Sequence, residues 1–151
     1  MIKELINKDL VIMNLNSQTK EGVFHELAHH LKNQGVISNY LFFLEDIYER
    51  ESLGSTGFGF GVAIPHAKSR YVSKPAVIFG KSKKGITYDS MDGKLVNLVF
   101  MIVMPHSDSK EHLLTLAWLS RKLIHEEFRN LLLATETKEE IIKLLEESDI
   151  E

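Results

Sequence analysis

A nearly unbroken apolar run from residue 95 to residue 103 constrains the fold more than any other feature of the sequence, because only Asn97 interrupts it. A strand with one wet face alternates apolar and polar residues, whereas a strand that is apolar throughout suits a sheet covered on both faces. Shorter apolar runs at residues 10–13, 62–64 and 76–79 predict further strands. The sequence therefore predicts a mostly buried sheet.

Amphipathic segments lie between and after these runs, at residues 20–32, 38–50, 111–120, 126–134 and 138–147, and their apolar spacing predicts helices. Thr19 can cap the first helix and Gly35 can end it. In the second helix, Leu41, Leu44 and Ile47 share the predicted apolar face. Because helices alternate with strands, we predict an α/β fold: a single domain over residues 1–151, in which a mixed, mostly buried β-sheet is flanked by helices on both faces.

The composition fits one ordinary domain and excludes several classes of protein. At 151 residues and 44% hydrophobic residues, the chain can bury roughly two-thirds of its unfolded surface in one core. A net charge of -3 gives no basic excess, so nucleic acid is not an expected partner. The sequence has no cysteine, and therefore no disulfide or thiolate chemistry. The start at Met1 lacks a signal-peptide pattern and the apolar runs are too short to span a bilayer, so we expect a cytoplasmic protein without membrane insertion.

The segment from Arg50 to His66 carries the residues best suited to chemistry. A neutral imidazole is nucleophilic near neutral pH, because its unperturbed pKa of about 6.5 leaves a lone pair on one ring nitrogen, so His66 could accept a phosphoryl group without a metal. Arg50 offers a planar fork of donors that matches phosphate oxygens. The hydroxyls of Ser55 and Thr56, with the backbone of the glycine-rich stretch 57–61, could line a phosphate-binding site.

The position of His66 in the predicted sheet supports the same interpretation. Pro65 cannot donate to a sheet ladder, so pairing should weaken there and leave His66 at the carboxyl end of strand 62–64. Ligands usually bind at that edge of an open α/β sheet, and the positive charges of Lys68 and Arg70 would favour an anion nearby. Judged on these residues alone, the opposing interpretation is a mobile glycine loop followed by an ordinary surface histidine.

The segment as a whole resembles the active-site signature of the IIA components of the phosphoenolpyruvate-dependent sugar phosphotransferase system (PTS), fructose/mannitol type. The matching positions are Arg50-Glu51, Ser55-Thr56-Gly57, Gly59, Gly61 and Ala63-Ile64-Pro65-His66. Residues 88–96, the apolar run after them and a helix opening at Glu111 are also similar to that family, so the resemblance covers nearly the whole chain. One departure is Tyr88, where many relatives have tryptophan, and we expect it to have no role in the chemistry.

The resemblance implies a phosphocarrier, that is, a phosphotransferase whose own histidine holds the phosphoryl group. The small carrier HPr would phosphorylate His66 to a tele-phosphohistidine, and His66 would pass the group to a cysteine of a IIB component during sugar uptake through the IIC membrane permease. Arg50 and a second histidine, His112, would flank the phosphoryl group and stabilise it. Such chemistry depends on positioning and charge, so no metal or other cofactor is expected. Phe58 and Phe60 could add an apolar rim for docking proteins.

A regulatory role is the alternative that the same motif leaves open. The nitrogen-related IIA proteins resemble this chain at the same positions, and in a regulatory module the phosphorylation state of the histidine would control the binding of a partner. A phosphoryl group on His66 adds roughly two negative charges, which is enough to create or break a docking surface. The sequence therefore leaves transport and regulation both open.

A remote alternative comes from His25-Glu26-Leu27-Ala28-His29, which matches the HExxH pattern of zinc metalloproteases. At about 100° per residue, the apolar residues of this helix face one way and both histidines face the other way, toward water. A catalytic zinc needs a third protein ligand and a cleft. Because His30 lies about 100° from His29, it cannot complete a site on this helix, and no metal site is predicted.

Overall fold

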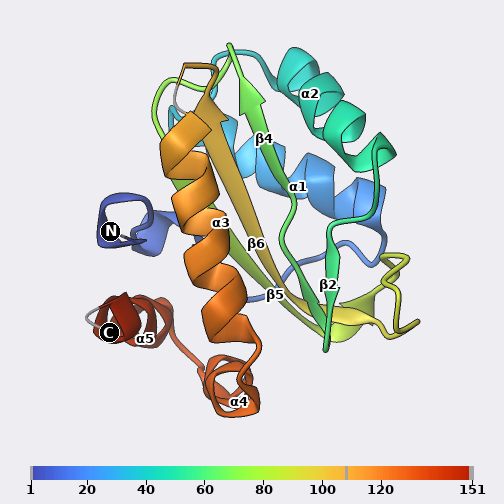
Figure 1. The fold of residues 1–151 in the computed structure, drawn as a ribbon, viewed down its shortest axis with the longest axis vertical. Coiled ribbons are helices and arrows are strands. Elements are labelled where there is room, and N and C mark those ends of the chain that lie inside the picture. Colours follow the sequence, from blue (N-terminus) through green and yellow to red (C-terminus); the bar gives the residue numbers. More distant parts are fainter. Residues whose placement is uncertain (1, 108, 150–151) are drawn as a thin grey trace.

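Six strands form one mixed sheet in the computed structural model, which describes residues 2–107 and 109–149 (Figure 1). The strands are β1 (Val11–Ile12), β2 (Gly57–Gly59), β3 (Val62–Ala63), β4 (His66–Ser69), β5 (Ala76–Ile86) and β6 (Val96–Pro105). The helices are α1 (Lys20–Asn33), α2 (Tyr40–Ser52), α3 (Ser109–Leu123), α4 (Glu126–Ala134) and α5 (Lys138–Asp149), with short 3-10 helices η1 (Ile2–Glu4) and η2 (Lys8–Leu10) near the start. The strand order is β1-β5-β6-β3-β2, and β4 also pairs with β6.

The strand predicted from the long apolar run lies at the centre of the sheet. β6 pairs antiparallel with β5 along one edge and parallel with β3 and β4 along the other. All residues from Leu98 to Met104 are buried, since α3 lies across one face of the sheet and α1 lies behind the other (Figure 1). The side-chain amide of Asn97, the exception in the run, donates to the Ser82 carbonyl at 2.9 Å. The α/β fold with a mostly buried sheet and helices on both faces is confirmed.

The first helix begins and ends as its flanking residues predict. Thr19 Oγ1 accepts a hydrogen bond from the Gly22 amide at 3.1 Å, which caps the first turn of α1. Gly35 follows the helix with a φ of 74°, a left-handed conformation that glycine adopts without steric cost. The face that α1 buries consists of Val23, Phe24, Leu27, Ala28 and Leu31.

The second helix buries most of its predicted face, including Leu44 and Ile47, with Tyr48 partly buried against the core. α2 starts after Asn39, whose side chain accepts from the Phe42 amide, rather than at residue 38. Its buried side chains are Phe43, Leu44 and Ile47. The expectation that Leu41 shares this face is wrong: Leu41 is 65% exposed, because it lies about 200° around the helix from Phe43.

The path of β4 corrects the expected position of His66. β3 and β4 keep one register against β6, and His66 lies opposite Ile102. Pro65 interrupts the strand because it lacks an N–H, but its carbonyl still accepts from the Ile102 amide at 2.9 Å. The strand therefore resumes at His66, which lies within the sheet and not at the carboxyl end of a strand.

Two strand segments differ from the sequence prediction. β5 continues past Phe79 to Ile86 through polar residues that gave no strand signal. Among them Lys81 is only 4% exposed, because its ammonium donates to the main-chain carbonyls of residues 132, 133 and 135 at the end of α4. β2, which pairs antiparallel with β3, was missed because its glycines have low strand propensity.

The last helices agree with their predicted positions. α4 spans the predicted residues, and α5 begins where predicted and runs slightly longer. α3 extends at both ends beyond the predicted 111–120. It covers one face of the sheet, and α4 lies next to its C-terminal end (Figure 1). Within the described ranges, none of the helices combines the length and apolar character that crossing a bilayer requires.

Candidate active site

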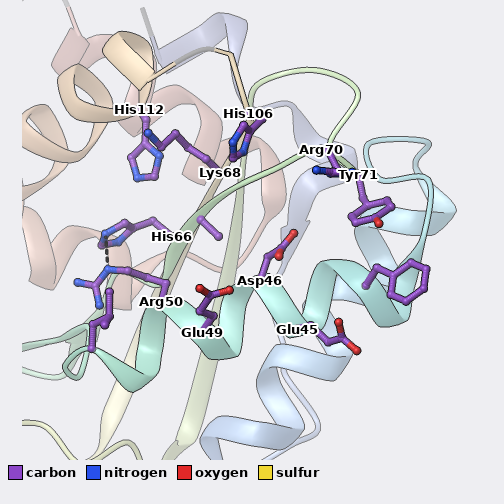
Figure 2. Close-up of a pocket in the computed structure, with 13 residues that line it drawn as sticks. Glu45, Asp46, Glu49, Arg50, His66, Lys68, Arg70, Tyr71, His106 and His112 are labelled. Atoms are coloured by element: carbon purple, nitrogen blue, oxygen red, sulfur yellow. Dashed lines mark hydrogen bonds between the residues drawn. The ribbon is translucent and has the colours of Figure 1, made fainter.

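Three predicted site residues from separate elements meet in one pocket of about 480 Å³ (Figure 2). Arg50 lies in the last turn of α2, His66 is the first residue of β4, and His112 lies in the first turn of α3. β4 packs against α2 and pairs with β6, which α3 covers, so the fold brings these side chains together. In Figure 2 the His112 ring and the Arg50 side chain lie on opposite sides of His66.

Both ring nitrogens of His66 have partners, and these partners define its tautomer. Nδ1 lies 2.8 Å from the Ile64 carbonyl oxygen, and Nε2 lies 3.3 Å from Nε of Arg50. A carbonyl only accepts and a guanidinium only donates, so the proton of the neutral ring is on Nδ1. The lone pair is therefore on Nε2, within the pocket.

The surroundings of His66 favour this neutral form. Partial burial lowers the pKa of His66 below its ordinary value, and the positive charge of Arg50 lowers it further. The hydrogen bond to Ile64 and the negative charge of Glu51 act in the opposite direction but do not cancel the decrease in pKa. The ring is thus a neutral nucleophile at neutral pH.

A second contact fixes the direction of the Arg50 guanidinium. Its Nη1 donates to the Gly54 carbonyl at 3.0 Å, in the turn that follows α2. One edge of the guanidinium is thereby held by the backbone while Nε points at His66. A planar, permanently charged fork in this position is suited to bind oxygens of a group attached to Nε2 of His66.

His112 is a buried neutral base beside His66. The two ring centroids lie 5.0 Å apart with the planes at 89°, an edge-to-face contact. Burial lowers the pKa of His112 to about 4, with further lowering by the positive charges of Lys68 and Arg50 and by the charge that His66 gains when it is protonated. His112 Nδ1 is buried without a hydrogen-bond partner in the described part of the chain. Its ring can therefore share or accept a proton when an anion is placed next to it.

The rest of the pocket wall mixes acidic and basic side chains. Glu45, Asp46 and Glu49 come from α2, and Lys68 and Arg70 come from β4 and the residue after it; the loop residue His106, for which no role was predicted, completes this set. Lys68 and Arg70 line the same pocket as His66, and their attraction of an anion stays a prediction. The acidic residues were missed, although Asp46 precedes Arg50 by four residues and one helical turn would have placed them together.

The predicted phosphate-binding hydroxyls of Ser55 and Thr56 are engaged elsewhere. Thr56 is 8% exposed, and its Oγ1 lies 2.6 Å from Glu51 Oε1 and 2.7 Å from the Tyr88 hydroxyl. Ser55 Oγ accepts from the Gly57 amide at 3.1 Å. Among the described residues, neither Ser55 nor Thr56 lines the pocket around His66. For Thr56 the cause is the buried carboxylate of Glu51, which attracts the Thr56 hydroxyl to the far side of the turn.

The predicted aromatic rim also lies outside the pocket wall. Phe58 is partly buried against the core, while Phe60 is 56% exposed. The Arg129 guanidinium of α4 lies over the Phe60 ring, 4.5 Å from its centroid. Phe60 is therefore accessible at the surface, and its role in docking stays a prediction.

The HExxH segment has a structural environment that differs from a zinc site. His25 and His29 are exposed, and both contact Tyr40: His25 Nδ1 hydrogen-bonds its hydroxyl, and the His29 ring lies 4.1 Å from the Tyr40 ring, centroid to centroid. Glu26 accepts hydrogen bonds from the amides of residues 16 and 17 and so anchors the loop before α1. Within residues 2–107 and 109–149, groups of three or more potential metal ligands are absent.

Comparison with known proteins identifies similar chains over nearly the whole length. Residues 4–148 match the family described as phosphoenolpyruvate-dependent sugar phosphotransferase system, EIIA 2. The PTS system fructose-specific EIIA component of Haloferax volcanii is 40% identical over 139 residues, covering 92% of this chain and 90% of that protein. The PTS system fructose-specific EIIABC component of Bacillus subtilis is 40% identical over 148 residues. The match covers 98% of this chain but only 23% of the length of the B. subtilis protein.

A solved structure shows the same fold with a related sequence. The nitrogen regulatory protein IIA-Ntr from Neisseria meningitidis superposes with a TM-score of 0.89 and 29% sequence identity. The match covers 95% of this chain and 98% of that one. The same overall fold is therefore found in a solved protein.

Proposed function

Because this chain belongs to the EIIA 2 family of the phosphoenolpyruvate-dependent sugar phosphotransferase system, as its sequence predicts, we propose that it carries a phosphoryl group on Nε2 of His66. The tautomer of His66 carries this proposal. The Ile64 carbonyl binds the Nδ1 proton, which leaves the Nε2 lone pair facing Arg50 in the pocket. Nε2 is the tele nitrogen, so the product is a tele-phosphohistidine.

The proposed reaction consists of two in-line displacements. In the first, the Nε2 lone pair forms a bond to phosphorus while the N–P bond of a donor phosphohistidine breaks, and the donor imidazole leaves with the electron pair. The proton on Nδ1 remains in its hydrogen bond to the Ile64 carbonyl, so no separate base is needed. In the second, a thiolate of the acceptor forms an S–P bond as the bond to Nε2 breaks, which restores neutral His66.

Arg50 and His112 stabilise the transferring group in this proposal. The Arg50 guanidinium already lies at Nε2, where the phosphorus would be attached. As the N–P bond forms, its Nε–H leaves the nitrogen lone pair and donates to the phosphoryl oxygens, so its charge offsets theirs. His112 lies on the other side of the His66 ring and is neutral before the reaction. It can take up a proton as the dianionic group arrives, which adds a second positive charge to the pocket.

We assign HPr as the phosphoryl donor and a IIB component as the acceptor, with the IIC permease served indirectly in the membrane. The names of the two relatives at 40% identity support a transport role, since both are called fructose-specific components. The B. subtilis relative is named EIIABC, which associates the three components in one protein. We place this carrier step in the cytoplasm, and the permease, not this chain, would select the sugar.

A regulatory function is the second candidate, supported by the solved relative. The nitrogen regulatory protein IIA-Ntr shares the fold at a TM-score of 0.89. In that case phosphorylation of His66 would add roughly two negative charges to the pocket and change its affinity for a partner. Both candidates share the phosphohistidine, and they differ in whether the phosphoryl group is passed on.

Radioactive labelling tests the proposal directly. HPr carrying a ³²P-phosphoryl group should label the wild-type chain and should leave His66→Ala unlabelled, because the variant lacks the acceptor nitrogen. His125→Ala, at an exposed histidine between α3 and α4, is the matched control and should be labelled like the wild type. Labelling of His66→Ala would reject the assignment. Passage of the label from the wild type to a IIB protein would favour transport, and retention of the label in its presence would favour regulation.

A further inference from the structure

The Glu51 carboxylate is a buried acceptor directly behind the pocket. Its side chain is 8% exposed. Oε2 accepts from the Thr56 amide at 2.9 Å and from Lys20 Nζ at 2.8 Å, while Oε1 accepts from the Thr56 hydroxyl at 2.6 Å. Glu51 therefore holds both polar groups of Thr56 that can donate, and we call this pair of contacts the Glu51–Thr56 clasp.

The clasp closes the turn that orients Arg50. The turn runs from the end of α2 to Thr56, and the Gly54 amide donates to the main-chain carbonyl of Glu51 at 3.2 Å. The Gly54 carbonyl in the same turn accepts from Nη1 of Arg50 at 3.0 Å. With Glu51 holding one end of the turn and Thr56 held at the other, the Gly54 oxygen has a fixed position, and so has the guanidinium.

The clasp also reaches His66 through the backbone. The Thr56 carbonyl accepts from the Ile64 amide at 3.0 Å, and the Ile64 carbonyl accepts from Nδ1 of His66 at 2.8 Å. Two hydrogen bonds on either side of one residue, Ile64, thus connect the position of Thr56 to the tautomer of the histidine. Both sides of the nucleophile, the proton on Nδ1 and the cation at Nε2, depend on where Thr56 lies.

Outer contacts hold the clasp in one arrangement. Because an ionised carboxylate cannot donate, the Thr56 hydroxyl donates to Glu51, and the Tyr88 hydroxyl then donates to Thr56 Oγ1 at 2.7 Å. Lys20 bridges Glu51 and Asp89 at 2.8 and 2.5 Å, and its ammonium lies 4.7 Å from the Tyr88 ring centroid. Burial alone would lower the pKa of Lys20, but the hydrogen bonds to Asp89 and Glu51 raise it overall, so the bridge stays charged.

We propose that Glu51 is a positioning residue for His66 phosphorylation, and that it acts through its hydrogen bonds to Thr56 and not through its charge. The reaction that it serves rests on the proposed function, whereas the geometry that it controls does not. In this account Thr56 and Tyr88 belong to the support of the site: Thr56 acts from behind the turn and does not touch the phosphoryl group, and Tyr88 gains a role that the sequence did not indicate.

Two substitutions at Glu51 separate hydrogen bonding from charge. Glu51→Met keeps the length and removes every acceptor, so both contacts to Thr56 are lost. Glu51→Gln is neutral too, but its oxygen can accept from the Thr56 amide and its NH₂ can donate to the Thr56 hydroxyl. We expect Glu51→Met to slow phosphorylation by HPr roughly 10- to 100-fold, the range typical of lost positioning, and Glu51→Gln to stay within about threefold of the wild type.

Nitrogen-15 NMR of the His66 ring gives a readout that needs no phosphoryl donor. The wild type and Glu51→Gln should show the single tautomer with the proton on Nδ1, and Glu51→Met should show a mixture. Thr56→Val, with Thr56→Ser as its conservative partner, repeats the test from the other side of the clasp should Glu51→Met fail to fold. Glu139→Met, on the exposed surface of α5, is the control and should match the wild type in rate and tautomer.

The outcomes distinguish this inference from the proposed function. Equal effects of Glu51→Gln and Glu51→Met on rate and tautomer would overturn it, since charge would then be the cause. Wild-type rate and tautomer in both Glu51→Met and Thr56→Val would overturn it as well. If the tautomer becomes mixed in Glu51→Met while even the wild type accepts no phosphoryl group from HPr, the positioning role stands and the proposed function fails.

Discussion

Phosphorylation of His66 should raise the pKa of His112 by about two units, because it places a dianion beside a ring that is now kept neutral. His112 has a pKa of about 4, set by burial and by the nearby positive charges of Lys68 and Arg50, with His66 adding to them when it is protonated. A phosphoryl group on Nε2 of His66 would place roughly two negative charges beside it, one of which is offset by the ring, because the proton stays on Nδ1. The neutral second histidine of the resting protein would thereby become a cation in the phosphorylated one.

The magnitude follows from the separation of the two rings. With the 5.0 Å between ring centroids as the distance, Coulomb's law gives about 0.8 kcal/mol per unit charge in water and about 3.3 kcal/mol at an effective dielectric constant of about 20. For a net charge of about one, these figures correspond to about 0.6 and about 2.4 pKa units. Since His112 is 7% exposed while Lys68 and Arg70 on the pocket wall are exposed, the effective value lies between these limits, and about two units is expected.

An NMR titration of the histidine Cε1–H signals tests this prediction. Between about pH 5 and pH 8.5 the His112 signal of the unphosphorylated protein should be nearly constant, and that of the protein kept phosphorylated by HPr should show a midpoint near pH 6. His125 is the internal control, since it lies beyond the other end of α3, about 20 Å away at 1.5 Å per residue. A His112 signal that does not titrate in the phosphorylated protein would refute the reasoning.

Three further predictions concern single substitutions. Arg50→Ala and His112→Ala should remain folded but transfer the phosphoryl group more slowly. The decrease should be roughly 10- to 100-fold for Arg50→Ala, because one charged hydrogen bond contributes about 1.5–3 kcal/mol. Equal rapid-quench rates in the wild type and both variants would remove these residues from the mechanism. His112 is neutral in the folded protein but protonates near pH 6.5 in the unfolded chain, so its contribution to stability is complete above about pH 6.5 and falls by up to about 3 kcal/mol as the pH drops toward 4. Urea unfolding at about pH 6.5 and at about pH 4 should therefore show a smaller loss of unfolding free energy for His112→Gln than for the wild type. Equal losses in the two proteins would contradict the assignment. Lys81→Met should lower the free energy of unfolding by about 2–4 kcal/mol, since the carbonyls of residues 133 and 135 at the end of α4 lose the buried ammonium that donates to them, whereas the exposed Lys83→Met should change it by less than about 0.5 kcal/mol; similar urea midpoints for the two variants would disprove the capping role.

The parts of the fold that the sequence predicts are those encoded by short-range patterns. The apolar run ending at Val103 and the capping residues Thr19 and Gly35 act locally, so their structures follow from neighbouring residues. The polar end of β5 does not, because Lys81 is buried only through contacts with α4, some fifty residues later in the chain. Likewise, Pro65 indicates a break locally, but pairing with β6 on either side of it keeps the strand in register.

The candidate site likewise has features that local sequence patterns predict and others that depend on contacts between distant residues. Phosphoryl transfer is the chemistry that the residue types favour, because a histidine can accept a phosphoryl group and an arginine can bind its oxygens, and it stays a prediction. Nothing in the spacing of Arg50, His66 and His112 places them together, and only the family resemblance did so. The hydroxyl of Thr56 shows the opposite failure: it lies close to the site in sequence, but the buried carboxylate of Glu51 turns it away.

The location of the phosphoryl group on a single nitrogen tests the account most directly. After phosphorylation by HPr, ³¹P–¹⁵N correlation on ¹⁵N-histidine-labelled protein should show one coupling, to Nε2 of His66, with Nδ1 still protonated and hydrogen-bonded to Ile64. A coupling to Nδ1 of His66, or to a ring nitrogen of any other histidine, would contradict the central claim.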